Sequence, residues 1–158
     1  MSDQFDSNER PDFDIEIKNI AEYVATPLKA SDEAKDTAYA CLLDSLGCGL
    51  LALRYPECVK HLGPRLGLNA NSGQVRVPGT HFQLDPEKAA WDIGCIIRWL
   101  DYNDTWLAAE WGHPSDNLGA ILAVADFVSQ RNRAEGKAAI GLDTVLEAMI
   151  KAHEIQGN

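Results

Sequence analysis

The sequence predicts a mainly α protein, an incomplete helical bundle of about five helices. Apolar residues recur with the 3.6-residue period of an amphipathic helix in several separate stretches. Residues that cap or begin helices precede most of these stretches, and proline closes two of them. Only residues 67–84 differ. Gly, Asn and Ser are frequent there, and a turn at Pro78–Gly79 indicates a brief extended stretch or hairpin.

The N-terminal half predicts two long helices and one short helix. The first is expected over residues 14–26, with Pro27 directly after its end. The second begins at an N-cap formed by Ser31–Asp32 and is closed by Pro56. A short helix over 57–66 follows. Each apolar stripe is expected to be buried, and that of the first helix consists of Ile17, Ile20, Ala21 and Val24.

Two glycines lie inside the apolar pattern of the second helix. Gly47 and Gly49 each cost about 1 kcal/mol relative to alanine at such a position. Close approach of another helix would offset this cost, so we expect the second helix to be buried against a neighbour. Cys41 and Cys48 share one face of the same helix, and core packing is the expected role of both.

Three further helices are expected in the C-terminal half. Asp85 as N-cap and Pro86 as first residue begin a helix that ends within 101–105. Its buried stripe is expected to consist of Ala89, Ala90, Ile93, Ile96, Ile97 and Leu100. Ser115 is expected to cap the next helix, whose stripe consists of Leu118, Ile121, Leu122, Ala125 and Val128.

The last helix is expected to begin near Asp143, with a capping box formed by Thr144 and Glu147. Its apolar period, within Val145–His153, continues almost to the final residue. No later segment of the sequence covers this stripe. The pattern therefore indicates a cut chain, with an ordinary helical terminus as the alternative, and an uncovered stripe would promote self-association.

Length, charge and cysteine content exclude several classes of protein. A chain of 158 residues suits one domain, and 24 acidic against 14 basic residues give a net charge of -10. This balance excludes non-specific nucleic-acid binding and polybasic membrane attachment. Residues 1–13 are acidic and polar, which predicts a flexible arm and no secretory signal. The four scattered cysteines match no metal site and indicate reduced thiols in the cytoplasm.

Polar and aromatic side chains are concentrated in residues 99–117. Three of the four tryptophans lie there, among carboxylates, amides, hydroxyls and one imidazole. An aromatic-walled pocket with a few placed polar groups is typical of a site for a small ligand. A carboxylate and an imidazole together can take up and release a proton near neutral pH. This segment is therefore the candidate site.

Each polar residue of this segment also suits an ordinary structural role. Asp101 follows an arginine by three residues, the spacing of an ion pair on a helix surface. Asp104 and Thr105 suit turns or caps, and His113 suits a hydrogen-bonded loop position. Residues 115–117 suit a cap of the following helix, whose free N–H groups would also hold a substrate carboxylate.

The histidines outside this segment carry weaker signals. His61 and His81 are expected on the surface or in loops, and His153 is expected to be a satisfied histidine at a helix interface. No glycine-rich phosphate loop, nucleophile elbow or zinc-protease motif is present in the sequence. No basic residue is placed to activate Cys58 as a nucleophile.

Several segments of the chain resemble the MmgE/PrpD family, and the resemblance covers almost the whole sequence. These segments are Tyr39–Gly49, Arg76–Thr80 with Phe82–Pro86, Ile97–Asn117 and Ala148–Gly157. The superfamily pattern D-x-x-D-T…H-P-S falls on Asp101, Asp104, Thr105, His113, Pro114 and Ser115. The W-L-A-A-E-W-G run before the histidine is similar to the dehydratase branch of the family rather than to its cis-aconitate decarboxylase branch.

The resemblance implies a hydro-lyase that needs no cofactor and no metal. Its expected substrate is a small tricarboxylic acid, 2-methylcitrate, and its product is 2-methyl-cis-aconitate, in propionate catabolism through the methylcitrate cycle. Asp101 and His113 are the implied candidates for acid and base, in either assignment of the two roles, in a tryptophan-lined cavity that they share. The residues implied to bind substrate are Asn103, Asp104, Thr105, Trp106 and Ser115. A cytoplasmic homodimer that binds neither nucleic acid nor membrane is implied for the whole enzyme.

Members of the family are roughly three times longer than this chain, with a large helical domain and a smaller lid domain. Residues 14–158 are therefore expected to form the N-terminal part of the helical domain, without the lid or the later basic active-site residues. We expect no turnover by this chain alone. The alternatives are a related family reaction on citrate or cis-aconitate, and a non-catalytic helical remnant that acts by association.

Overall fold

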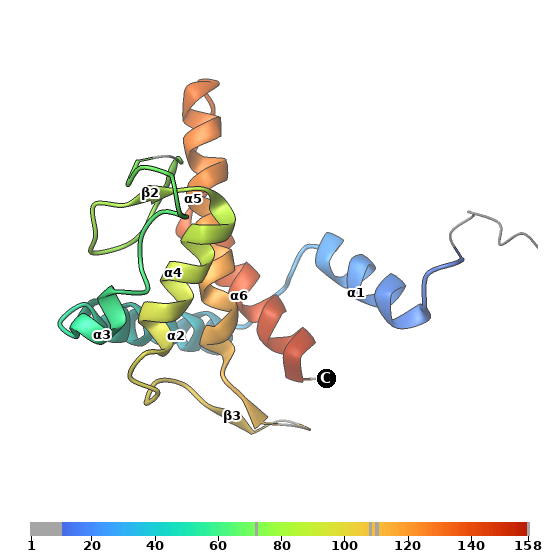
Figure 1. Cartoon of the computed structure of the whole chain (residues 1–158). Coiled ribbons are helices and arrows are strands. Elements are labelled where there is room, and N and C mark those ends of the chain that lie inside the picture. Colours follow the sequence, from blue (N-terminus) through green and yellow to red (C-terminus); the bar gives the residue numbers. More distant parts are fainter. Residues whose placement is uncertain (1–10, 72, 108, 110, 158) are drawn as a thin grey trace, which may run out of the picture.

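The computed structural model describes residues 11–71, 73–107, 109 and 111–157, so most of the predicted arm over 1–13 lies outside the described residues. The mainly α prediction is confirmed (Figure 1). The helices are α1 (Ile15–Ala25), α2 (Asp32–Ala52), α3 (Pro56–Val59), α4 (Pro86–Arg98), α5 (Leu118–Ala134) and α6 (Leu142–Gly157), with a 3-10 turn, η1 (Pro114–Asn117). The strands are β1 (Val75–Arg76), β2 (Gln83–Leu84), β3 (Trp106–Leu107) and β4 (Trp111–Gly112).

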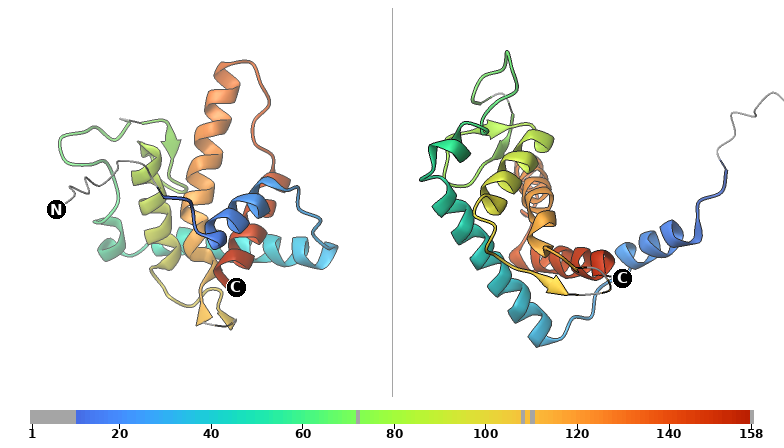
Figure 2. Two further views of the ribbon diagram at one scale, coloured as in Figure 1. Left: turned by 90° about the vertical axis from the view of Figure 1, so that its right-hand side faces the viewer. Right: turned by 60° about the horizontal axis from the view of Figure 1, so that its bottom comes forward.

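The core lies where α2, α4 and α5 meet. In Figures 1 and 2, α4 and α5 stand side by side, α2 runs across them, and α6 packs beside α2 and α5. The predicted apolar stripe of α4 supplies the centre of this core, because Ile93, Ile96 and Ile97 are almost fully buried. Leu42 of α2 and Leu118 of α5 pack into the same cluster.

The N-caps predicted for α2 and α4 are both present. The Ser31 hydroxyl accepts from the Ala34 N–H at 3.2 Å, and Asp85 Oδ1 accepts from the Lys88 N–H at 3.0 Å. Each bond satisfies an N–H group that a helix start leaves without an intrahelical partner. Local chemistry therefore fixes where these two helices begin.

The glycine prediction for α2 is right at one position and wrong at the other. A Cβ atom on Gly49 would lie 3.3 Å from Ile96 Cγ1, so this glycine does allow close packing of α4. A Cβ atom on Gly47 would meet nothing within 4 Å. Only Gly49 is therefore a packing position.

The predicted hairpin is present as an antiparallel pair, with Val75 opposite Leu84 and Arg76 opposite Gln83. Gly79 in its turn has φ +74°, a left-handed conformation that suits glycine. The Arg76 N–H donates to Asp126 Oδ2 at 2.9 Å, and its guanidinium pairs with the same carboxylate. These contacts fix the hairpin against α5.

Several predicted boundaries are wrong. The third major helix ends at Arg98 rather than within 101–105, and the short helix over 57–66 is reduced to Pro56–Val59. The capping box at Thr144 is wrong because α6 already begins at Leu142. Its expected partner Glu147 instead accepts from the Leu28 N–H at 3.1 Å and pairs with Lys151.

The apolar stripe of α1 is not buried, contrary to the prediction. This helix has no buried residue and projects away from the other helices (Figures 1 and 2). It is attached at its C-terminal end, where the Lys151 ammonium donates to the carbonyls of Val24 at 2.9 Å and Thr26 at 2.7 Å. The 3.6-residue period shows that a helix has an apolar side, but it does not identify a covering element.

The stripe of the last helix is covered more fully than predicted. Leu146 is buried, and Val145, Met149, Ile150 and His153 are partly buried. This cover comes from α2 and α5, which precede α6 in the chain. No helix in the described part of the chain is both long enough and apolar enough to cross a bilayer.

Candidate functional site

A cavity of about 320 Å³ lies between α2, α6 and the residues around β3 and η1. The candidate segment supplies Asp104, Trp106 and Ser115 to its wall. Helix α2 adds Ala38, Cys41 and Ser45, and α6 adds Met149, Ile150 and His153. Three predicted substrate-binding residues therefore lie on one cavity, whose wall is otherwise mainly apolar.

Ser115 joins two of the predicted residues into a buried hydrogen-bonded frame. Its N–H donates to Asp104 Oδ2 at 2.8 Å, and its hydroxyl accepts from Asn103 Nδ2 at 2.9 Å. The prediction that Ser115 caps the next helix is wrong, because it lies inside η1 and α5 begins only at Leu118. The frame holds the Asp104 carboxylate in one orientation on the cavity wall.

Arg98 is the basic residue of this region, and its guanidinium is already paired with other side chains of the same segment. Its guanidinium donates to Asn103 Oδ1 and to Asp101, and its Nε lies 3.0 Å from Asp116 Oδ1. The Asp101 side chain is 74% exposed in this ion pair. The structural role that the spacing offered for Asp101 is therefore present, and Arg98 organises the segment.

His113 is oriented by the backbone of the same segment. Its Nδ1 lies 2.6 Å from the Asp104 carbonyl oxygen and 3.5 Å from the Thr105 hydroxyl. Because a carbonyl oxygen only accepts, Nδ1 carries the proton in this contact. In the neutral ring, Nε2 is then left as the basic nitrogen.

The structure separates the predicted site residues into two groups. Asp104, Trp106 and Ser115 line the cavity, and Asn103 donates to the hydroxyl of Ser115 without lining the cavity itself. The residues that do not line it are Asp101, Thr105 and His113. The cavity that Asp101 and His113 were expected to share is thus not this one, and their acid and base roles stay predictions. Trp106 is the tryptophan that lines the cavity, whereas Trp99 and Trp111 are exposed.

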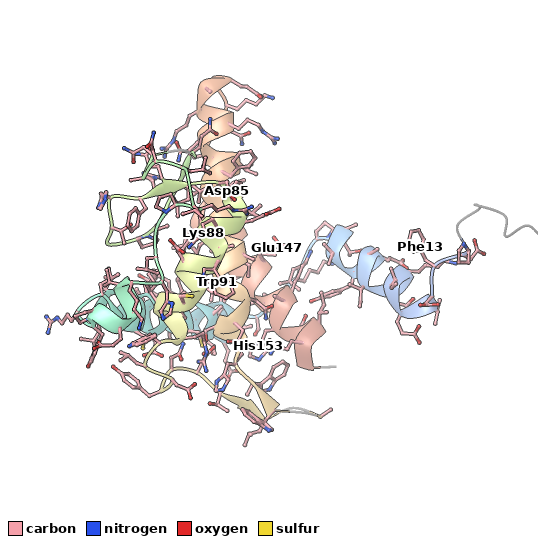
Figure 3. All side chains as sticks on the ribbon, viewed as in Figure 1. Phe13, Asp85, Lys88, Trp91, Glu147 and His153 are labelled. Carbon is pink, nitrogen blue, oxygen red and sulfur yellow. The ribbon has the colours of Figure 1, made fainter. Side chains whose placement is uncertain are left out.

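His153 lines the cavity, although the sequence analysis did not assign it to the site. It extends from α6 toward β3 (Figure 3), and its ring centroid lies 3.6 Å from that of Trp106. Burial lowers the pKa of its imidazole below the ordinary 6.5, and the negative charge of Asp104 opposes this shift. The helical face it shares with Met149 was the available signal, but that face suits a packed histidine equally well.

The lowered pKa of His153 predicts a pH-dependent stability. The unfolded chain takes up this proton near pH 6.5, whereas the folded chain takes it up only at lower pH. The free energy of unfolding should therefore fall as the pH drops below about 6.5, and level off below the folded-state pKa. Urea unfolding of the wild type and of His153→Gln across pH 5–8 measures this, since other groups cancel in the difference.

The exposed His61 provides the matched control for this measurement. The pH profile of His61→Gln is measured in parallel, so that removal of an exposed imidazole can be compared with removal of the half-buried one. If the His153→Gln profile were parallel to that of the wild type, protonation of the His153 imidazole would not change the free energy of unfolding.

The negative charge of the cavity wall limits which ligands the cavity can bind, unless other groups supply positive charge. Asp104 and Glu154 line it, and its described wall contains no lysine or arginine. Burial and then the nearby Asp104 carboxylate raise the pKa of the Cys41 thiol, which disfavours a thiolate nucleophile. Within the described ranges, no group of three or more His, Cys, Asp or Glu side chains is arranged to hold a metal ion.

Comparison with known proteins gives consistent matches along the chain. A model described as the MmgE/PrpD N-terminal domain matches residues 18–158. The 2-methylcitrate dehydratase of Escherichia coli strain K12 is 61% identical over 151 residues, which cover 96% of this chain and 31% of that protein. The enzyme of the same name from Cupriavidus necator is 56% identical over 157 residues, covering 99% of this chain and 32% of its own length.

A more distant relative gives the same result. The "2-methylcitrate dehydratase, mitochondrial" of Yarrowia lipolytica is 50% identical over 159 residues, covering 99% of this chain and 30% of its own length. The chain spans about a third of the length of these curated relatives. Because the family model covers nearly all of the sequence, the chain belongs to the MmgE/PrpD family, in its N-terminal domain.

Proposed function

We propose that this chain forms part of the active site of an enzyme that removes water from 2-methylcitrate to give 2-methyl-cis-aconitate, the step that the family resemblance places in propionate catabolism. The main supporting observation is the cavity that gathers Asp104, Trp106 and Ser115 from the family motif. The relatives named above carry this activity in their names.

Dehydration removes a proton from one carbon and hydroxide from its neighbour, so the site needs one base and one acid. His113 suits the base, because its Nδ1 contact leaves Nε2 available. Asp101 is the second proton-transfer candidate carried over from the motif. Asp104, Trp106 and Ser115 are the proposed substrate-binding residues, supported by their place on the cavity wall.

A tricarboxylate also needs positive charge, because buried carboxylates are stabilised only when they are paired. The described cavity wall supplies no cation, and Arg98 is occupied by Asp101, Asn103 and Asp116. The cations of the proposed active site must therefore come from groups outside the described wall. This charge balance is the physical reason to expect no turnover by the 158-residue chain alone.

The test is a turnover assay on two proteins. One is the chain itself, and the other is a chimera in which this chain replaces the matched third of the Escherichia coli relative. We expect the chimera to form 2-methyl-cis-aconitate at a rate within about tenfold of that relative, and the chain alone to form none. Ultraviolet absorbance of the conjugated product measures both rates.

The Escherichia coli relative is the positive control, and circular dichroism verifies that the chimera folds. A folded chimera without activity would contradict the proposal, and turnover by the isolated chain would contradict the charge argument. Parallel assays with citrate and cis-aconitate distinguish 2-methylcitrate dehydration from the two related reactions.

A homodimer and a cytoplasmic location belong to the same proposal. Light scattering of the chimera tests the homodimer, and cell fractionation tests the location.

A further inference from the structure

An apolar groove of about 380 Å³ lies between α5 and α6, apart from the cavity described above. Its lining includes Ile121, Val124 and Val128 of α5 and Val145 and Ala148 of α6. No charged side chain is among the described residues that line it. Val124 is 56% exposed in this α5–α6 groove, so a branched aliphatic side chain lies in contact with water.

Helix α5 is apolar on two opposite sides. Leu118 and Ala123 lie in the core, whereas Ile121 and Val124 line the groove. The first eleven residues of the helix contain one charged side chain, Asp126. A helix that is apolar all round is typical of a protein interior or a membrane span. Because no helix in the described part of the chain is long and apolar enough to cross a membrane, α5 is suited to a protein interior.

The comparisons indicate what covers the outer side of α5. The matched residues make up 31% and 32% of the two bacterial relatives, so about two thirds of each relative has no counterpart among these residues. A second copy of this chain is a poor alternative, because two chains of net charge -10 repel each other.

The chain's own helix α1 also has an exposed apolar side, but it is held elsewhere. The Lys151 ammonium binds the carbonyls of Val24 and Thr26, which fixes the C-terminal end of α1 beside α6. From there α1 projects away from the other helices (Figures 1 and 2). The groove therefore needs a partner from outside the matched third.

The side chains of the groove suit a helix as that partner. Ile121, Val124 and Val128 follow the helical spacing i, i+3, i+7, and they form an apolar ridge about two turns long. Ala125 and Ala148 also line the groove, and such small side chains allow a neighbouring backbone to approach closely. A third helix packed against two others is the usual arrangement of a helical bundle.

We propose that the α5–α6 groove is the docking site of an amphipathic helix from the part of the family's chain that these residues do not match. The apolar side of that helix covers Ile121, Val124 and Val128, and α5 becomes an interior helix. The proposal rests on the family membership and on the two apolar sides of α5, and it does not depend on the reaction proposed above.

Thiol labelling tests the cover directly, without turnover. Val124→Cys is introduced into the 158-residue chain and into the chimera with the Escherichia coli relative, and labelling by N-ethylmaleimide is followed by peptide mass spectrometry, which separates this thiol from the natural cysteines. We expect Val124→Cys to react at least about tenfold more slowly in the chimera than in the isolated chain, because a covered thiol reacts only after local opening.

Leu66→Cys is the matched control, since this leucine is fully exposed and does not line the groove. It should react at the same rate in both proteins. Equal rates for Val124→Cys in the two proteins, or equal protection of both positions in the chimera, would overturn the proposal. Slow labelling of Val124→Cys in the isolated chain would also overturn it. Protection that increases with concentration would then identify a second copy, and protection independent of concentration would identify α1.

Thermal unfolding provides a second readout. Val124→Asn is expected to lower the thermal midpoint of the chimera by about 3 °C or more, because a buried amide would lack a partner, and to change that of the isolated chain by less than about 1 °C. Leu66→Asn should leave both midpoints unchanged. An equal shift in both proteins for Val124→Asn would contradict the proposal. If Val124 is covered but the chimera does not dehydrate 2-methylcitrate, the proposed function fails and the docking site stands.

Discussion

Asp92→Ala is expected to lower the free energy of unfolding by about 3–5 kcal/mol. Asp92 is fully buried on α4, where it pairs with the Lys88 ammonium and accepts from the Gly63 N–H at 2.7 Å. Alanine would leave both a largely buried ammonium and a buried N–H group without their carboxylate. Urea unfolding monitored by circular dichroism measures the change.

An exposed ion pair is the control for this variant. Glu135 pairs with Lys137 at 2.6 Å, and both side chains are largely exposed. Glu135→Ala is therefore expected to cost less than about 1 kcal/mol. If Asp92→Ala destabilised the chain no more than this control, the buried pair would not be the contact that fixes the residues around Gly63 to α4.

Gly119→Ala is expected to lower the free energy of unfolding by about 3 kcal/mol, through overpacking at the contact of α4 and α5. A Cβ atom on Gly119 would lie 2.6 Å from the Ala90 carbonyl oxygen and 2.9 Å from the Gly94 nitrogen. Both are backbone atoms of α4, so the clash is relieved only by moving one helix away from the other. The loss is measured by urea unfolding, as for Asp92.

The opposite change is expected in α2. Gly47 lies in the helix interior with nothing within 4 Å of its Cβ position. Gly47→Ala should therefore raise the free energy of unfolding by about 0.5–1 kcal/mol, because alanine has the higher helix propensity. Similar effects for the two substitutions would show that helix propensity, rather than the approach of two backbones, decides the Gly119 result.

The helices that sequence analysis predicted well are those with complete local signals. Helices α2 and α4 begin directly after their predicted N-caps, Ser31 and Asp85, because an N-cap hydrogen bond joins residues only three positions apart. The family resemblance was equally accessible, because its motifs are continuous stretches of sequence. A predicted helix start was wrong where the side chain that should cap it binds a residue far away in the sequence. Glu147 accepts from the Leu28 N–H instead of capping α6.

The candidate site was found only in part for the same reason. The motif identified Asp104, Trp106 and Ser115, but its continuous pattern does not show which side chains face a cavity. Ser115 was interpreted as a helix cap because its bonds to Asn103 and Asp104 form only in the folded loop. His153 and Ser45 were missed because their place in the site depends on how α6 and α2 pack around β3.

Local physics thus accounts for the helical character, the main caps, the acidic charge and the family of this chain, since each depends on neighbouring residues or on composition. Packing over long distances decides the rest. It leaves the apolar side of α1 exposed, separates Asp101 from the cavity, and brings Ser45, Asp104 and His153 to a common wall. These outcomes depend on which helices meet, and hydrophobic period specifies an apolar side without specifying its partner.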